Sequence, residues 1–253
     1  MDLTPPIGIP VDGTRPAGGP VGAGPVDASP PAVGTRSLVL VLGEARRRGL
    51  GYATAKRLLD TVTAATLLIV LLPVFAIIAL AILLDTGGPI LYRAERVGRF
   101  GKPFHVVKFR SMRAGCSTTP HVAFVQSLLR EGTQCSVYKV AEDRRVTRVG
   151  AFLRCTSLDE LPQLWNVLRG DMSLVGPRPD VSYAVAEYAD WMHRRLMVKP
   201  GITGLWQVSG RSRIGLLDMY RLDVRYVGAA SFLTDVRILL RTIPVVLGRE
   251  GAV

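Results

Sequence analysis

The stretch of sequence that organises the fold is residues 142–180, which read E-D-R-R-V-T-R-V-G-A-F-L-R-C-T-S-L-D-E-L-P-Q-L-W-N-V-L-R-G-D-M-S-L-V-G-P-R-P-D. Four apolar residues in it recur at helical spacing: Leu158, Leu161, Trp165 and Leu168. This period predicts a helix that starts near Ser157 and ends at Gly170. Ser157, with Glu160 three positions later, forms a capping-box pattern at the start of that helix.

Asp159 and Glu160 fall in the first turn of the expected helix, where free amides and the helix dipole favour ionised carboxylates and can also bind an anion. Two ordinary interpretations stay open, because Glu160 could simply complete the cap and Asp159 could be a favourable first-turn acid. Cations accompany the pair in the sequence: Lys108, Arg110, Arg154 and Arg178, the last in the rigid turn 176–179. Adjacent acids among Arg and Lys suit a phosphorylated substrate, with one acid on Mg²⁺ and the other attacking or orienting. A carboxylate can also attack phosphorus and form an acyl phosphate.

Upstream of this stretch, the 24 residues from Thr61 to Leu84 carry no charge. As a straight helix they would measure about 36 Å, enough to cross a bilayer core of about 30 Å. A buried helix of a soluble protein is the alternative. Pro73 lies in the middle of the run and is expected to interrupt the helix.

The charges that flank the apolar run bear on its topology. Basic residues lie on both sides of it: Arg46, Arg47, Arg48, Lys56 and Arg57 before it, and Arg93, Arg96, Arg99 and Lys102 after it. Because basic flanks stay in the cytoplasm, a single crossing satisfies only one of them. A re-entrant helix that dips into the membrane and returns at Pro73 satisfies both, and we favour it over a full crossing.

Composition limits the remaining function classes. The net charge of +12 on a chain with mean hydropathy +0.27 predicts an anionic partner, which could be phospholipid, nucleic acid or a phosphorylated substrate. Three cysteines without a C-x-x-C pair, and three scattered histidines, argue against a zinc site or a disulfide scaffold. P-loop and G-x-G-x-x-G motifs are absent.

Residues 1–36 contain seven Gly and eight Pro, which predicts a disordered tail, followed by a basic linker at 37–51.

Several motifs together resemble one family, the bacterial sugar transferases, which are monotopic polyprenyl-phosphate phosphoglycosyltransferases. They are K-R-L-L-D at 56–60, G-G-P-I-L-Y-R at 87–93, E-R-V-G-R-F-G-K-P-F at 95–104, K-F-R-S-M at 108–112, T-R-V-G-A-F-L-R-C-T-S-L-D-E-L-P-Q-L-W-N-V-L-R-G-D-M-S-L-V-G-P-R-P at 147–179, K-P-G-I-T-G-L-W-Q-V-S-G-R at 199–211 and L-D-V-R-Y-V at 222–227. The resemblance covers about residues 52–248.

The resemblance implies transfer of a phosphosugar from a nucleotide sugar, usually a UDP-sugar, to a polyprenyl phosphate. It makes Asp159 the nucleophile that forms a covalent phosphosugar intermediate, and Glu160 the ligand of Mg²⁺. The positions that match phosphate contacts of the family are Lys108, Arg154 and Arg178, and Asp223 matches a family acid that we group with them. It also implies a re-entrant anchor, and the lack of four preceding spans matches the short form of the family.

We therefore expect a helix-rich α+β enzyme at the cytoplasmic face of the inner membrane. The expected parts are a re-entrant anchor at 52–86 and a catalytic domain at 87–248, with interfacial amphipathic helices. Residues 231–247 form an apolar-rich helix that could lie in the interface or dock into the core. The expected partners are a nucleotide sugar, polyprenyl phosphate and membrane lipid, and no nucleic acid. A non-catalytic membrane-surface protein that docks to anionic lipid or recruits glycan-assembly partners is the alternative.

Overall fold

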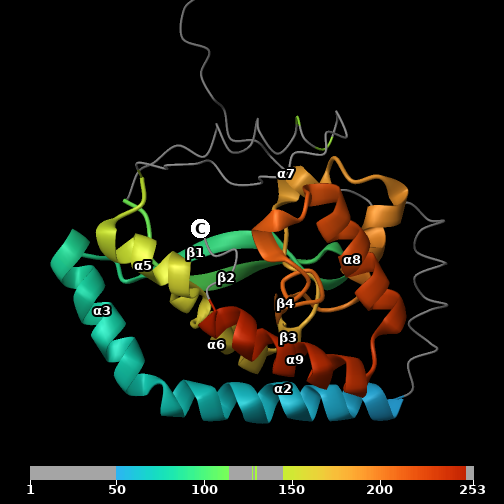
Figure 1. The fold of residues 1–253 in the computed structure, drawn as a ribbon, viewed down its shortest axis with the longest axis horizontal. Helices are drawn as coiled ribbons and strands as arrows, with labels where there is room; N and C mark the ends of the chain where they lie inside the picture. Colours follow the sequence, from blue (N-terminus) through green and yellow to red (C-terminus); the bar gives the residue numbers. More distant parts are fainter. Residues whose placement is uncertain (1–49, 114–126, 128, 130–144, 249–253) are drawn as a thin grey trace, which may run out of the picture.

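The protein is described here by a computed structural model that covers residues 50–113, 127, 129 and 145–248 (Figure 1). The predicted tail at 1–36 and all but the end of the predicted linker at 37–51 lie outside these residues. Within the described ranges the chain is rich in helix and has two small sheets, as expected for the helix-rich α+β class. The domain boundaries stay predictions.

The uncharged run forms two helices, α2 (Leu50–Val70) and α3 (Leu72–Thr86), which are bent by 60° at the break between them. Pro73 lies in the first turn of α3, where a helix tolerates its missing N–H. The interruption expected near Pro73 is therefore confirmed, as a bend and not as a reversal. In the described part of the chain no single helix is long and apolar enough to cross a membrane, and only this bent pair together meets that criterion of length and composition. In Figure 1, α2 runs along the lower edge of the molecule and α3 turns away from its end.

A buried carboxylate fixes α2 to the rest of the protein. Asp235, only 1% exposed, accepts hydrogen bonds from Lys56 Nζ at 2.8 Å and from Tyr52 Oη at 2.9 Å. It also accepts one from Tyr226 Oη at 2.6 Å. One carboxylate thus joins the start of α2 to two C-terminal helices.

Further along α2, two side chains form hydrogen bonds with backbone groups in the rest of the protein. Arg57 donates from both terminal nitrogens, to Val167 O at 2.7 Å and to Leu168 O at 2.8 Å. Asp60 Oδ1 accepts a hydrogen bond from Leu174 N at 3.0 Å. The polar side of α2 is therefore bonded to the body, and Ala64 continues the contact into the main hydrophobic core.

The larger sheet is an antiparallel hairpin of β1 (Leu91–Val97) and β2 (Pro103–Phe109), with Leu91 paired to Phe109. A short 3₁₀ turn, η1 (Arg99–Gly101), joins the strands. The strands expected at 90–93 and 104–109 are both present, and the first extends to Val97.

The smaller sheet is a parallel pair, β3 (Ser173–Val175) and β4 (Gly201–Thr203). Both strands lie near the centre of the molecule, above α9 and α2 in the view of Figure 1. Val175 is buried in the main core together with Tyr226.

One helix from Ser157 to Gly170 was expected, and this is wrong. The chain instead forms α5 (Arg148–Thr156), a 3₁₀ turn η2 (Leu158–Glu160) and then α6 (Gln163–Arg169). Ser157 stands between α5 and η2.

The reason lies in two residues at the junctions. Ser157 has φ 59° and closes α5, with its N–H directed to the carbonyls of the last turn, and its side chain caps nothing. The capping box with Glu160 is therefore not formed. Pro162 has no N–H to continue the 3₁₀ turn and instead precedes the first residue of α6. Gly170, with φ 90°, ends α6 where the sequence predicts.

A side chain of α6 satisfies the outer edge of β2. Asn166 Oδ1 accepts a hydrogen bond from Val107 N at 3.0 Å, and Asn166 Nδ2 donates one to His105 O at 2.7 Å. The amide thus takes the place of a neighbouring strand, and it holds α6 in register with the hairpin.

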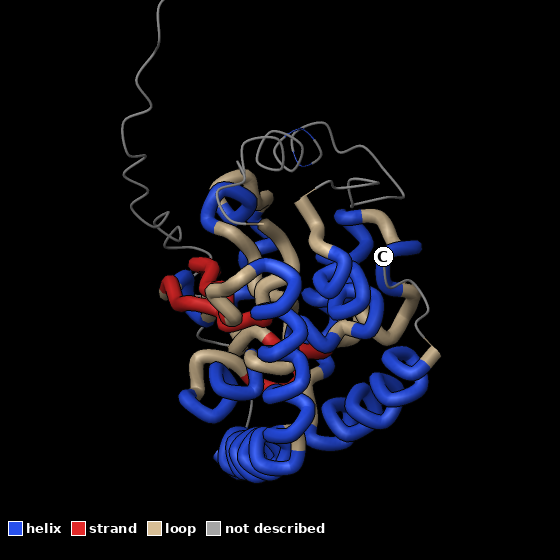
Figure 2. The backbone as a smooth tube through the Cα atoms, turned by 90° about the vertical axis from the view of Figure 1, so that its left-hand side faces the viewer, coloured by secondary structure: helices blue, strands red, loops and turns tan. Residues whose placement is uncertain are grey.

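The C-terminal part completes the body with α7 (Ser182–Val185), η3 (Asp190–Met197), η4 (Arg211–Arg213), α8 (Leu216–Ala229) and α9 (Phe232–Leu247). Helix α9 combines the two interpretations left open for residues 231–247. Its Asp235 and Ile238 are buried against the body, whereas other apolar side chains are exposed. The exposed ones are Phe232, Leu233, Leu240, Ile243 and Leu247. Figure 2 shows the helices around the small strands from the side.

Gly150 in α5 packs directly on the backbone of Ser111, and a Cβ there would lie 2.0 Å from Ser111 O. We expect Gly150→Ala to lower the free energy of unfolding by about 3 kcal/mol or more, because the clash is with backbone that has little freedom to move. Gly228→Ala is the matched control: a Cβ there meets nothing within 4 Å, and helix propensity should raise stability by about 0.5–1 kcal/mol. Unfolding in detergent micelles, followed by far-UV circular dichroism, measures both changes. Equal stability of Gly150→Ala and wild type would contradict the close packing.

Candidate active site

Asp159 and Glu160 lie in η2, the short turn between α5 and α6. The left-handed Ser157 sends the chain into this turn at the end of α5. Asp159 is buried, with 9% of its surface exposed, and the Glu160 side chain is 16% exposed. The two acids predicted from the sequence are thus adjacent, shielded from water and held by local backbone geometry.

Glu160 is held between two cations from distant parts of the chain. Its Oε1 lies 2.7 Å from Lys108 Nζ of β2 and 2.6 Å from Arg178 Nη2. Arg178 Nη1 also donates to Oε2 at 3.2 Å, so the guanidinium binds the carboxylate in a bidentate manner. Burial acts to raise the pKa of Glu160, but Arg178 and Lys108 outweigh it and hold the pKa well below its usual range. Glu160 is therefore ionised at neutral pH.

Asp159 has a different electrostatic environment. Burial raises its pKa above the ordinary value, and the neighbouring Glu160 charge adds to this rise, while Lys108, Arg178 and Arg154 oppose it. Among the described residues none donates a hydrogen bond to the Asp159 carboxylate. A buried carboxylate near cations but without donors keeps its oxygen lone pairs for an incoming electrophile.

Arg154 and Arg211 extend the positive surroundings. Arg154, in the last turn of α5, acts on the charge of Asp159. Arg211, in η4, lies close enough to Glu160 and Arg178 for both charges to affect it, while burial lowers its pKa. Arg211 ends the motif at 199–211 but was not singled out from the sequence, and its position after Gly210 at a turn was the only signal available.

Asp223 is paired with Arg195, although Arg178 is near enough for its charge to lower the pKa of Asp223. It is 1% exposed and lies 2.8 Å from Arg195 Nη2, and burial raises its pKa to about 6 although Arg195 opposes the rise. Arg195 in turn donates to the backbone carbonyl of Arg178 at 3.0 Å. Asp223 therefore acts on the site through Arg195 and the turn that carries Arg178.

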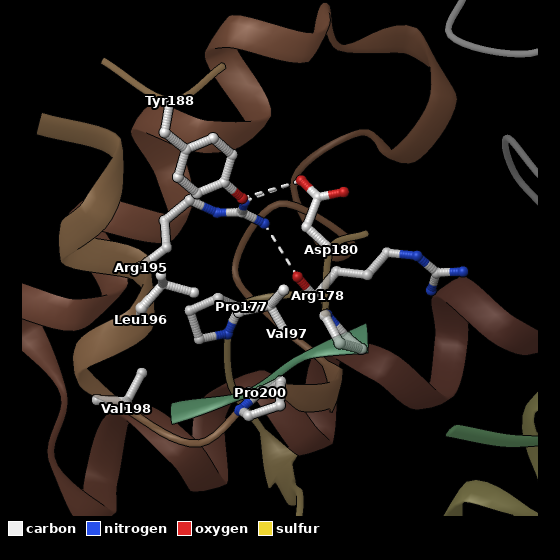
Figure 3. Close-up of a pocket in the computed structure, with 11 residues that line it drawn as sticks. Val97, Pro177, Arg178, Asp180, Tyr188, Arg195, Leu196, Val198 and Pro200 are labelled. Atoms are coloured by element: carbon white, nitrogen blue, oxygen red, sulfur yellow. Dashed lines mark hydrogen bonds and ion pairs between the residues drawn. The ribbon is translucent and has the colours of Figure 1, made fainter. Parts of the chain in front are cut away.

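The same network fixes Asp180, two residues after Arg178. Its Oδ2 accepts hydrogen bonds from Tyr188 Oη at 2.9 Å and Tyr220 Oη at 2.5 Å, and lies 3.3 Å from Arg195 Nη1. Figure 3 shows Arg195 directed at Asp180 and at the Arg178 carbonyl, whereas the Arg178 guanidinium points the other way. The cavity beside them has a volume of about 10 Å³, room for one water molecule and no substrate. The network is thus a support for Arg178 and not a binding pocket.

The two acids differ in how well they suit Mg²⁺. No cluster of three or more His, Cys, Asp or Glu side chains in the described ranges could enclose a metal ion. Mg²⁺ commonly takes one or two carboxylates and completes its shell with phosphate oxygens and water. Glu160 fits that pattern because it is ionised and its Oε2 accepts a single hydrogen bond, at 3.2 Å. The arrangement can therefore hold a diphosphate between cations, with two carboxylates of different basicity at its centre.

Comparison with known proteins gives a consistent assignment. Residues 51–249 match the family described as "Bacterial sugar transferase". The "UDP-galactose-lipid carrier transferase" of Erwinia amylovora is 44% identical over 197 residues, which are 78% of this chain and 41% of that protein. The "Undecaprenyl-phosphate galactose phosphotransferase" of Salmonella typhimurium is 43% identical over the same fractions. The chain thus spans about two fifths of the length of these relatives. The "UDP-glucose:undecaprenyl-phosphate glucose-1-phosphate transferase" of Caulobacter vibrioides is 41% identical over 78% of this chain and 71% of that protein.

Removing Arg195 tests the support network. We expect Arg195→Met to lower the free energy of unfolding by about 3–5 kcal/mol at pH 7.5, because the buried Asp223 and the partly buried Asp180 lose their cation. The pKa of Asp223, already raised, should rise further without Arg195, so the folded variant binds a proton more readily than the unfolded chain. Its stability deficit should therefore shrink as the pH falls from 7.5 to 5.

Arg221→Met is the matched control, since Arg221 pairs with Asp218 on the surface and both side chains are more than half exposed. Arg221→Met should change the free energy of unfolding by no more than about 1 kcal/mol at either pH. Denaturant unfolding at the two pH values measures all three proteins. A deficit in Arg195→Met that does not change with pH would contradict the role given to the buried carboxylates.

Proposed function

The chain belongs to the bacterial sugar transferase family, and we propose that it transfers a sugar phosphate from a UDP-sugar to a polyprenyl phosphate. The products would be a polyprenyl diphosphate sugar and UMP, and the reaction would start the assembly of a membrane-bound glycan. The observation that carries the proposal is the pair of shielded carboxylates within a group of cations from four elements. The activities named for relatives that are about 40% identical over most of this chain support it.

In the proposed first step, a carboxylate oxygen of Asp159 attacks the β-phosphorus of the nucleotide sugar. The bond between the β-phosphorus and the bridging oxygen breaks, UMP leaves with the electron pair, and the sugar phosphate stays on Asp159 as an acyl phosphate. In the second step an oxygen of polyprenyl phosphate attacks the same phosphorus and releases the Asp159 carboxylate. The two transfers together conserve the phosphate ester of the sugar.

The surrounding cations would stabilise the negative charge that develops on the phosphate oxygens. Lys108 and Arg178 are bonded to Glu160 before substrate arrives, so their positions are set in advance. Arg154 lies near enough to act on the charge of Asp159, and Arg211 lies near enough for Glu160 to affect it. A diphosphate that enters between them would share these cations with Glu160, while their charges oppose protonation of Asp159.

Glu160 is the residue that we propose as the protein ligand of Mg²⁺. The metal would supply positive charge to the diphosphate and would help UMP to leave. What the chain itself contributes is an ionised carboxylate at the mouth of the site, kept ionised by Arg178 and Lys108.

We further propose that α2 and α3 form a re-entrant anchor on the cytoplasmic face of the inner membrane. Exposed apolar side chains surround the bend: Ile69, Val70, Leu72 and Ile77. Helix α3 is about 22 Å long. If the 60° bend is the deepest point and both helices slope equally toward it, the bend lies only about 11 Å below the surface of a core about 30 Å thick. The exposed apolar side of α9 would rest on the same surface.

Substitution of the two acids tests the transfer. Asp159→Asn should reduce turnover more than about a thousandfold, because the amide cannot form the acyl phosphate. Glu160→Gln should reduce it about tenfold to a hundredfold, because Lys108 and Arg178 lose their charged partner. Release of UMP from a panel of UDP-sugars, with polyprenyl phosphate and Mg²⁺ present, measures turnover.

Two further observations make this test specific. Intact mass measurement after incubation with UDP-sugar alone should find a phosphosugar adduct on wild type and none on Asp159→Asn. The control Asp218→Asn removes a surface acid and should keep full activity. Full turnover of Asp159→Asn would refute the covalent mechanism, and the absence of UMP release from wild type would favour the non-catalytic membrane-surface alternative.

Cysteine labelling tests the anchor. Gly51→Cys and Arg93→Cys place one thiol before and one after the apolar run, at exposed positions, in a chain whose own three cysteines are replaced by serine. An impermeant maleimide should label both in inverted inner-membrane vesicles and neither in intact spheroplasts. Labelling of the two positions from opposite sides would show a full crossing.

A further inference from the structure

A second group of cations lines a cavity beside α2, with a volume of about 160 Å³. Among the described residues that line it there are four cations and a single carboxylate: Lys56, Arg57, Arg99, Lys199 and Asp60. None of these cations belongs to the group around Asp159 and Glu160. A cavity of this size holds several water molecules or one phosphate group.

Several charged groups of the cavity already have partners within the protein. Lys56 is paired with Asp235, and the Asp60 carboxylate already accepts the Leu174 amide. Arg57 directs two donors to the carbonyls at the end of α6, which fixes its guanidinium but adds no negative charge. The cavity therefore keeps an excess of positive charge.

Lys199 is a cation of this cavity for which the described residues supply no hydrogen-bond acceptor, although the side chain is half-buried. Lys199 Nζ and Arg57 Nη2 both lie 3.4 Å from the point where a Cβ on Gly170 would stand, so two cations crowd the end of α6. Burial lowers the pKa of Lys199, and Arg57 and Arg99 lower it further while Asp60 opposes them. Like charges held together in this way are stabilised by an anion between them.

The position of the cavity identifies the kind of anion. It lies at the C-terminal end of α6, whereas Asp159 and Glu160 precede the N-terminal end, so the two sites are separated by the length of that helix. The cavity is lined by one side of α2, and on other sides of the same turns Leu58 is 64% and Val62 is 55% exposed. An apolar helix surface next to a cationic cavity matches a lipid, whose chains contact the helix and whose headgroup phosphate reaches the cations.

We propose that this cavity binds the phosphate of an anionic membrane phospholipid, held by Lys199, Arg57 and Arg99. The site is separate from the one that carries out transfer, and it would fix the depth and rotation of α2 at the membrane surface. The shared chemistry is a phosphate group, so the test must distinguish a lipid headgroup from free phosphate. The proposal depends on the membrane association proposed above but not on turnover.

Binding to the purified full chain in a neutral maltoside detergent tests it. The probes are dihexanoyl phosphatidylglycerol, dihexanoyl phosphatidylcholine and inorganic phosphate, and the readout is the thermal unfolding midpoint as a function of probe concentration. Phosphatidylglycerol should raise the midpoint of wild type with saturation. Lys199→Met, which keeps most of the side-chain length, should bind it about tenfold more weakly or worse, because it loses a charge-assisted hydrogen bond.

Two variants control the result. Lys102→Met removes an exposed lysine outside the cavity and should bind as wild type does. Arg99 lines the same cavity from η1. Arg99→Gln should therefore also weaken phosphatidylglycerol binding, and it tests the site even if Lys199→Met folds poorly. Unchanged affinity in both Lys199→Met and Arg99→Gln would overturn the site. An equal shift with inorganic phosphate or with phosphatidylcholine would overturn the assignment to an anionic lipid.

Because the readout is lipid binding and not UMP release, the two proposals fail separately. An inactive chain that still binds phosphatidylglycerol through Lys199 would refute the transferase and keep the lipid site. A chain that releases UMP but does not bind phosphatidylglycerol through Lys199 would keep the transferase and refute the lipid site.

Discussion

The carboxylate of Glu160 has little access to water, and it stays ionised only because Lys108 and Arg178 lie against it. Burial without these partners would favour the protonated acid. Pairing Glu160 with both cations requires three parts of the chain to lie together: β2, the turn η2 and the turn at 176–179. Each must hold its side chain within hydrogen-bond distance, so the fold is organised around this contact. Asp159 differs because burial, together with the neighbouring Glu160 charge, outweighs the cations around it, so its pKa is raised instead of lowered. Two adjacent acids thereby acquire the unequal proton affinities that acid–base and nucleophilic roles need.

Support for this contact comes from buried polar groups away from the surface of the site. Arg195 links Asp180 and Asp223 to the carbonyl of Arg178, with two tyrosine hydroxyls completing the network. Elsewhere in the molecule, Asp235 joins α2 to the C-terminal helices. Both networks place charge in the interior, where it contributes only if each partner is present. Their common effect is to fix the direction of a helix or turn instead of adding net stability.

Helical spacing and composition predicted the end of α6 at Gly170, the strands at 104–109 and near 90–93, and the interruption near Pro73. The two acids were singled out by their cationic neighbours in the sequence, and their roles came from the family resemblance. What the sequence did not reveal depends on three-dimensional contact. Ser157 looked like a helix cap, and only its left-handed backbone shows that it ends one helix before the next begins. Arg211 is 51 residues from Glu160 along the chain, and no local pattern relates the two. Asp223 matched a motif, but its burial against Arg195 could not be read from spacing.

Asn166 has a consequence outside the chemistry. By pairing its side-chain amide with Val107 N and His105 O, it closes the one edge of β2 that its partner strand leaves open. Exposed strand edges are templates for the addition of strands from other molecules, and proteins protect them with charge, bulges or covering elements. Here a single amide does so while it also packs α6 against the hairpin. The hairpin is thereby kept from recruiting foreign strands, a safeguard that matters wherever many copies share a crowded surface.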